Sequence, residues 1–183
     1  MWGIVGPDKV SHFEDGRSIV GVFVASGYDH DTIDWVFRSW RQFNRDFDAR
    51  WHLLIPTTVP IDDERTKIDA NTFNVALAEE LRQTYGLRRK ELPGIVFENF
   101  NDEEPQLFIP LRNRDSEQLR SFFEACERRM AIDRPELANR YRYRSEIIGE
   151  IVNEDRLKQL TPFVARLVKS TGSIARIMSG RLS

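Results

Sequence analysis

The side chains that could perform acid–base or metal chemistry gather in one short segment. Tyr28, Asp29, His30 and Asp31 follow one another directly after an apolar run. An imidazole and two carboxylates at this spacing could bind a metal ion or transfer a proton. Acids at this point also have a structural role, because they cap the free amide groups of a helix start and oppose the helix dipole. We favour the capping interpretation and predict neither a metal site nor a cofactor.

Thiol chemistry is limited by the cysteine content. The chain has one cysteine, Cys126, so a single chain forms neither an internal disulfide nor a cysteine-based metal cluster. The helical spacing of its apolar neighbours places Cys126 on the buried side of a helix, where it should behave as a small hydrophobe. Of the other histidines, His52 falls in a buried strand and His12 in a loop. Neither is indicated as a ligand.

A second group of candidates lies in the last third of the chain. Residues 1–133 carry 17 Lys and Arg against 24 Asp and Glu, whereas residues 134–183 carry 10 against 5. Such a basic segment can bind nucleic acid, an anionic membrane surface or an acidic partner, or it can pack on its own acidic body. Arginines interleaved with tyrosines could also stack on bases. The interaction candidates are Arg140, Tyr141, Arg144, Arg156, Lys158, Arg166 and Lys169.

The composition is typical of a soluble globular protein. The 183 residues are 40% hydrophobic and 31% charged, with a mean hydropathy of -0.48, which excludes collagenous and wholly disordered chains. No apolar run approaches the roughly 18 residues that a membrane span requires. The N-terminus lacks the pattern of a secretory signal. We therefore expect a cytoplasmic protein without a transmembrane segment.

Alternating strands and helices must position these groups. Short apolar runs at 18–25 and 51–55 predict two buried strands. Apolar residues three and four positions apart predict helices over 31–46 and 70–85, the second ended by Gly86, where a left-handed residue is tolerated.

The following segment predicts a hairpin and a third helix. Strands at 94–99 and 107–109 are separated by an acidic turn, which indicates an antiparallel pair. Asp115 or Asn113 can cap the next helix, which should end near Ala131.

The tail from residue 133 onward has a helical pattern of weaker hydrophobicity. Pro135 and Pro162 can each begin a helix, since a proline there loses no internal hydrogen bond, and Gly172 would end the second. A tail of this size must cover its apolar stripe with its own body or with another chain, and we favour another chain. The stripe consists of Leu157, Leu160, Val164, Leu167 and Val168.

This order of elements over residues 18–131 resembles the thioredoxin fold. Tyr85 to Arg88, leading through Leu92-Pro93 into the strand at 95–97, is similar to the helix, linker, cis-proline and third strand of that family. The resemblance implies an α/β three-layer sandwich with a central mixed sheet, here followed by a C-terminal helical extension. We divide the chain into a thioredoxin-like domain and a basic helical extension, at residues 1–131 and 132–183. The family's cis-proline corresponds to Pro93, which should face Tyr28 to Asp31 across a cleft.

The cysteine pair that performs the family's chemistry is missing. The matching segment reads Tyr28-Asp29-His30-Asp31, so the chain is not a dithiol oxidoreductase. Ser26 is the remaining candidate for a nucleophile near this helix, although a serine at a strand end is usually a turn residue.

From these observations we predict a redox-inactive thioredoxin-like protein that acts as an interaction or assembly module, with a protein partner or a second copy of itself. We favour a protein without enzymatic activity. Two alternatives remain open. One is a non-thiol enzyme that uses the cleft beside Pro93. The other is binding of nucleic acid or a membrane surface through the basic tail.

Overall fold

The computed structural model describes most of the chain. The described residues are 2–14, 18–46, 50–59, 69–100, 106–132, 139–158 and 166–168, and the side chains of 40–46, 140, 155–158 and 166–168 are outside the description.

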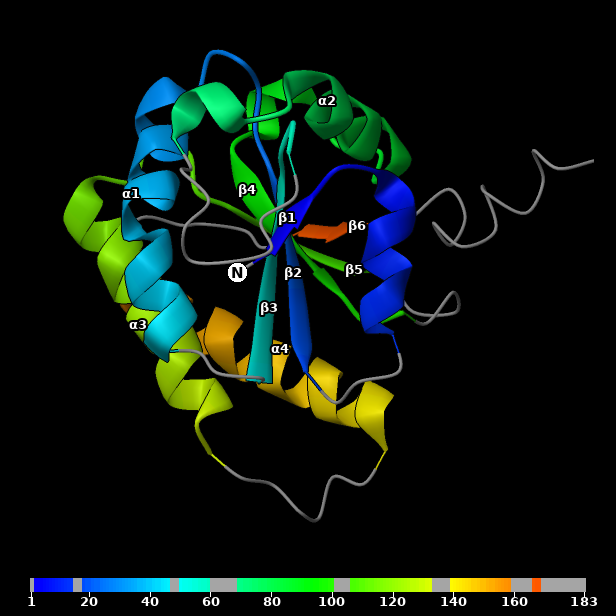
Figure 1. The fold of residues 1–183 in the computed structure, drawn as a ribbon. Helices are drawn as coiled ribbons and strands as arrows, with labels where there is room; N and C mark the ends of the chain where they lie inside the picture. The colour runs from blue at the N-terminus through cyan, green and yellow to red at the C-terminus, as the bar shows by residue number, and fades with distance from the viewer. Residues whose placement is uncertain are drawn as a thin grey trace, which may run out of the picture.

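Strands of the described ranges form one mixed sheet of six strands in the order β1-β3-β2-β4-β5-β6 (Figure 1). The strands β1, β3 and β2 are parallel, and β4, β5 and β6 each run antiparallel to the strand before them in this order. Their bounds are β1 Trp2–Ile4, β2 Ile19–Val24, β3 Trp51–Pro56, β4 Gly94–Glu98, β5 Gln106–Pro110 and β6 Arg166–Val168.

Helices cover both faces of this sheet. The α-helices are α1 (His30–Asp46), α2 (Val75–Thr84), α3 (Ser116–Met130) and α4 (Arg140–Lys158), and short 3₁₀ helices are η1 (Pro7–Phe13), η3 (Ala70–Thr72) and η4 (Arg89–Glu91). Figure 1 shows α1 and α3 on one face, α2 and η1 on the other, and α4 across the end of the sheet where β2 begins. Each face has its own apolar core. None of the helices in the described ranges combines the length and apolar character needed to cross a membrane.

The two predicted buried strands, the hairpin and the first three helices are confirmed. Every residue of β2 is buried, which explains its unbroken apolar sequence, because a central strand is covered on both faces. Cys126 is fully buried on α3, as expected. The peptide bond between Leu92 and Pro93 is cis, and Gly86 adopts the left-handed conformation with φ 61° after α2.

Side-chain caps decide where two helices begin. The side chain of Asn74 accepts a hydrogen bond of 3.0 Å from the amide of Leu77, so α2 begins at Val75, five residues later than predicted. The Asp115 carboxylate accepts from the amides of Glu117 and Gln118 at 2.9 and 2.8 Å. Asp115 is therefore the cap of α3, and Asn113 instead lies in the preceding turn with φ 62°.

The prediction of a helix that begins at Pro162 and ends at Gly172 is wrong. Residues Arg166–Val168 form β6, which pairs with β5. Local periodicity could not reveal this strand, because the hydrogen-bonding groups that it satisfies belong to β5, about 60 residues earlier in the sequence. The proposed helix start at Pro135 lies outside the described residues.

The apolar side of α4 is covered by the chain itself. Tyr143, Ile147, Ile148, Ile151 and Val152 are buried in the core that α1 and α3 share with the sheet. For α4 the expectation that another chain covers the tail is therefore wrong. The stripe from Leu157 to Val168 lies outside the described side chains, and its cover stays a prediction.

A buried carboxylate joins α2 to the hairpin. Glu98 of β4 is buried, the Tyr85 hydroxyl donates to its Oε1, and Gln106 Nε2 donates to its Oε2 at 2.6 Å. Burial, together with the adjacent carboxylate, raises the pKa of Tyr85 well above its usual value. The phenol therefore remains a donor at all ordinary pH values.

Replacement of Tyr85 by Phe should destabilise the fold by about 1–3 kcal/mol, because a buried carboxylate then loses a donor. Tyr28→Phe is the matched control. Tyr28 is 93% exposed, so its hydroxyl is in contact with water and its removal should not destabilise the fold. Urea unfolding of both variants measures the difference. Equal stability of Tyr85→Phe and Tyr28→Phe would contradict the role of this hydrogen bond.

Candidate functional site

The loop after β2 is held by a serine–aspartate turn. Both the main-chain amide and the Oγ of Ser26 donate to Asp29 Oδ2 at 2.7 Å. The amide of Tyr28 donates to Ser26 Oγ at 3.3 Å, and the carbonyl of Asp29 accepts from the amide of Ile33 in the first turn of α1. The Asp29 carboxylate thus turns back onto Ser26 rather than onto the helix amides, and it fixes the loop.

These contacts limit the chemistry that the candidate residues predicted in this loop can perform. The Ser26 hydroxyl has the turn role that the sequence favoured, and among the described residues no histidine contacts it. Tyr28, His30 and Asp31 project into solvent. The described part of the chain contains no group of three or more His, Cys, Asp or Glu side chains that could hold a metal ion.

Pro93 lies at the same end of the sheet. Val24 pairs with Gly94, so the next residues outward, Ala25 and Pro93, are neighbours. The Pro93 carbonyl accepts from the Leu111 amide at 2.7 Å, which ties the loop before β4 to the turn after β5. Pro93 itself is buried. Pro93 is therefore not an exposed contact residue.

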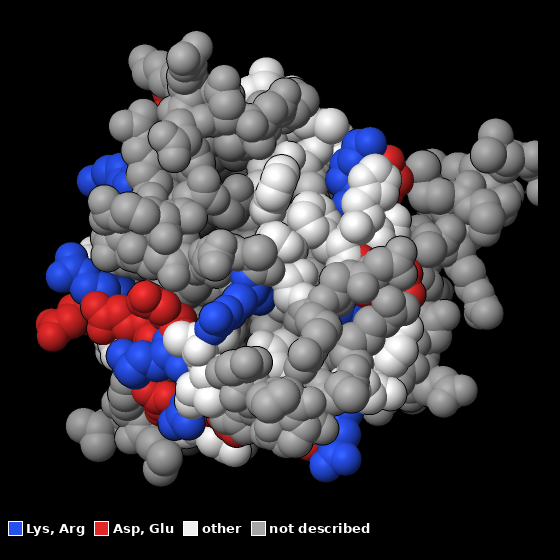
Figure 2. Space-filling model, turned by 60° about the horizontal axis from the view of Figure 1, so that its bottom comes forward, with Lys and Arg blue, Asp and Glu red and all other residues white. Residues whose placement is uncertain are grey.

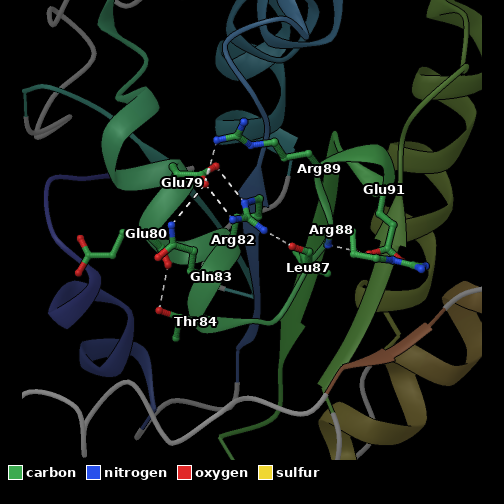
Figure 3. A network of polar contacts seen from close by, with 9 residues as sticks. All are labelled: Glu79, Glu80, Arg82, Gln83, Thr84, Leu87, Arg88, Arg89 and Glu91. Atoms are coloured by element: carbon green, nitrogen blue, oxygen red, sulfur yellow. Dashed lines mark hydrogen bonds and ion pairs between the residues drawn. The ribbon is translucent and has the colours of Figure 1, made fainter.

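A polar network holds the segment that leads to Pro93 (Figure 3). Arg82 forms two parallel hydrogen bonds with Glu79, at 2.9 and 2.8 Å, and donates to the Leu87 carbonyl. Arg89 reaches the same carboxylate at 3.3 Å. The Arg82 guanidinium, which donates to Glu79, lowers the pKa of this carboxyl to about 2. These bonds hold η4 against α2.

Two further contacts complete the support of this loop. The Glu91 side chain accepts from the amide and the guanidinium of Arg88, at 2.7 and 2.8 Å. Arg112 NH1, from the turn after β5, donates to the Lys90 carbonyl at 2.7 Å. The segment from Leu87 to Pro93 is therefore attached on both sides, to α2 and to the turn before α3.

Exposed apolar side chains gather at this end of the sheet. Val5, Tyr28 and Val59 follow the parallel strands β1, β2 and β3, and Val75 begins α2. They account for four of the six large hydrophobic residues that are exposed in the described ranges. A methyl group on Gly27 would lie 3.5 Å from Val75 Cγ1, so the Tyr28 loop packs beside α2. We call Val5, Tyr28, Val59 and Val75 the apolar end.

Sequence reasoning found Tyr28 but missed the three valines. Val75 falls outside the four-residue repeat of Phe73, Leu77, Leu81 and Tyr85, which are all buried and of which Leu77 and Leu81 belong to α2. An apolar residue outside the buried stripe of a helix indicates an exposed apolar side chain, so the sequence did contain a signal for Val75. Val5 and Val59 carry no such signal, because only the strand topology brings their loops to the same end.

Five of the seven tail candidates, Arg140, Tyr141, Arg144, Arg156 and Lys158, belong to α4 at the opposite end, and Arg166 belongs to β6. Arg144 is fully buried and anchors α4, since its guanidinium donates to the carbonyls of Ser18 at 3.1 Å and Glu14 at 3.0 Å. It also stacks on the Phe100 ring at 4.8 Å. Arg144 is therefore not a surface contact residue, and Tyr141 is half-buried. The side chains of Arg140, Arg156, Lys158 and Arg166, and all of Lys169, lie outside the description.

The described surface near α4 carries both signs of charge. Figure 2 shows acidic and basic side chains beside one another on the face that includes this end of the molecule. Arg128 pairs with Glu154 at 2.6 Å, and Arg142 pairs with Glu146 at 2.8 Å. Over the described residues this face is not a uniform basic field of the kind that a nucleic acid requires.

His52 has a structural role on β3. Its Nδ1 accepts a hydrogen bond of 3.0 Å from the indole of Trp2, and Phe13 packs against its ring. Burial lowers the pKa of His52 to about 4. A neutral ring that serves as an acceptor fits the sequence expectation that His52 is no ligand.

No family model, curated protein or solved structure matches the chain. The role of the apolar end is therefore argued from its own geometry.

Replacement of Glu79 by Gln should change how stability depends on pH. The depressed pKa of Glu79 means that its charge stabilises the fold above about pH 4.5, and this contribution is lost as the pH falls through about 2. The wild type should be more stable than the variant at pH 7, by a small amount because the network is partly exposed to water. The difference should shrink between pH 4.5 and 2.

Urea unfolding at pH 7, 4 and 2.5 tests this expectation. Glu80→Gln is the control, since Figure 3 shows the Glu80 side chain directed away from the arginines that surround Glu79. A difference between wild type and Glu79→Gln that is as large at pH 2.5 as at pH 7 would show that the charge of Glu79 is not what holds η4.

Proposed function

We propose that this chain is a thioredoxin-like protein without dithiol chemistry, which binds another protein through the apolar end. The observation that carries the proposal is the exposure of Val5, Tyr28, Val59 and Val75 at one end of the sheet, where side-chain hydrogen bonds hold the loops of Tyr28 and Val59. Exposed apolar residues that lie close together on an ordered surface are a feature of protein-binding sites.

The sheet supports the thioredoxin-like assignment. Its first five strands follow the order β1-β3-β2-β4-β5, with β4 antiparallel to both of its neighbours, β2 and β5, and β5 therefore parallel to β1, β2 and β3. Helices on both faces give the three layers that the resemblance implies (Figure 1). In this assignment α4 and β6 are additions to the fold, and the β2 loop and Pro93 occupy the functional end.

Thiol chemistry at that end has no residue to perform it. The loop from Ser26 to Asp31 contains no cysteine, and Cys126 is buried on α3 within the core. A non-thiol enzyme has less support, because the Asp29 carboxylate is engaged by Ser26 and the described residues offer no metal-binding cluster. The fold therefore supports a surface for recognition rather than a site for reaction.

The composition of the apolar end favours a protein partner. Tyrosine is enriched in protein interfaces because it combines a large apolar area with a polar tip and few rotatable bonds. The 93% exposure of Tyr28 leaves nearly the whole side chain available. Loops that are ordered before binding lose less conformational entropy in the complex. The Ser26–Asp29 turn supplies this order for the Tyr28 loop, and the bond from Thr57 Oγ1 to the Val59 carbonyl supplies it for the Val59 loop.

Substitution of Val75 by Asp should abolish partner binding. The full chain is used as bait in an extract of its native cells, and proteins retained by wild type are compared with those retained by the variant. A carboxylate forced against an apolar partner surface should reduce retention at least tenfold. Ile132→Asp is the matched control, because Ile132 is 45% exposed against 47% for Val75 but lies after α3.

Circular dichroism and thermal unfolding establish that both variants are folded. Specific proteins that are retained by wild type and Ile132→Asp, and lost with Val75→Asp, support the apolar end as the binding surface. Equal retention by all three chains would contradict it.

The absence of dithiol chemistry is tested separately. The purified chain should not accelerate the reduction of insulin by dithiothreitol above the rate of a Cys126→Ala variant, because one buried thiol cannot exchange a disulfide. A rate that depends on Cys126 would contradict the redox-inactive assignment.

A further inference from the structure

The edge of the sheet at β5 is filled by a short strand from the tail. Strand β6 pairs with β5 over three residues, with Leu167 opposite Leu107. β5 itself has five residues, and Phe108 and Ile109 are buried. Without β6 the main-chain groups of β5 would form an open edge that invites another strand.

The helix before β6 is anchored without it. Five side chains of α4 lie in the core, from Tyr143 to Val152. Arg144 binds the carbonyls of Ser18 and Glu14 and stacks on Phe100. Glu154, near the end of α4, accepts from Arg128 at 2.6 Å and from Arg129 at 2.7 Å. Detachment of β6 therefore leaves α4 and the sheet from β1 to β5 intact.

Release of β6 breaks a pairing of three residues and exposes the main-chain hydrogen-bonding groups of β5. Three residues of pairing contribute little compared with the core, so local opening requires much less free energy than global unfolding. The open state combines an unpaired β5 with a loose strand of matching register. At sufficient protein concentration, each loose strand finds the same edge on another copy, where it makes the contacts it made in its own chain.

The charges of the tail and the body attract each other between two copies of this chain as well as within one. From Arg156 onward the tail carries only basic charges, whereas residues 1–133 carry an excess of acids. Val168 pairs with Gln106 and is followed in sequence by Lys169, while Asp102, Glu103 and Glu104 shortly precede Gln106. A basic strand approaching this acidic body is attracted whether it belongs to the same chain or to a second one.

We propose that the β5 edge is a strand-accepting interface and that two copies of this chain associate by exchanging β6. Each β6 then pairs with β5 of the partner copy in the register seen here. Seven residues, 159–165, separate α4 from β6. An extended segment of that length spans roughly 25 Å, which allows the strand to reach a neighbouring edge. The interface is independent of the apolar end, which lies at the carboxyl ends of the parallel strands.

Disulfide trapping between two variants, each with one cysteine added to the native Cys126, tests the exchange. Residues directly opposite in antiparallel strands have Cα atoms about 4.5–5.5 Å apart, which suits a disulfide. Full chains carrying Leu107→Cys and full chains carrying Leu167→Cys are mixed at high concentration, oxidised with diamide and examined by non-reducing electrophoresis. Cys126 is buried and common to all samples, so wild type measures its background.

Two further samples make the outcome decisive. Leu107→Cys mixed with Arg142→Cys measures random collision, since Arg142 is exposed on α4. The double variant Leu107→Cys/Leu167→Cys, oxidised when dilute, measures pairing within one chain. Circular dichroism establishes that each variant is folded.

Exchange predicts a cross-linked dimer from the Leu107→Cys and Leu167→Cys mixture, at least tenfold above the Arg142→Cys control. Its yield should rise with the concentration and the time of mixing. Internal cross-linking of the dilute double variant without any dimer in the mixture would overturn the proposal, because β6 would then remain on its own chain. Failure of both to cross-link would overturn it as well, since β6 would not occupy the β5 edge.

Discussion

The central strand β2 is buried along its whole length and hydrogen-bonds to β3 on one side and to β4 on the other. This position determines what each end of the molecule can contain. At its carboxyl end, the pairing of Val24 with Gly94 brings the Ser26 loop beside Pro93. At its start, the Ser18 carbonyl accepts from Arg144, which draws α4 across the sheet. Both functional proposals depend on this arrangement.

The two ends of the sheet are stabilised by different interactions. At the apolar end, side-chain hydrogen bonds hold loops whose apolar residues face solvent, so the cost of ordering the surface is met during folding rather than at binding. At the α4 end, main-chain carbonyls and aromatic stacking accommodate a buried guanidinium. Arginine suits that place because its planar group carries several donors in fixed directions. Hydrogen bonds thus order the Ser26 loop at the first end, and a buried arginine attaches α4 at the second.

Features that depend on local sequence were predictable. The unbroken apolar run of β2, the left-handed Gly86, the Asp115 cap and the buried Cys126 all follow from residue type and short-range spacing. Each is decided by a few neighbouring residues, which the sequence displays directly.

Features that depend on distant partners were not predictable. Arg144 has the appearance of a surface residue, since its partners are main-chain carbonyls that no residue type reveals. β6 satisfies an edge formed some 60 residues earlier, and its three residues carry too little pattern to exclude a helix. The grouping of Val5, Val59 and Val75 requires the parallel order of three strands. The candidate site was therefore found only in part.

The central claim, that the apolar end is ordered before any partner binds, is tested most directly by amide hydrogen exchange measured by NMR on the free protein. The amides of Ser26 and Leu111 should exchange slowly, because the first donates to Asp29 and the second to the Pro93 carbonyl. Asp29→Ala should accelerate exchange at Ser26 and leave Leu111 unchanged. Exchange at Ser26 in the wild type as fast as in an unstructured peptide would contradict the account.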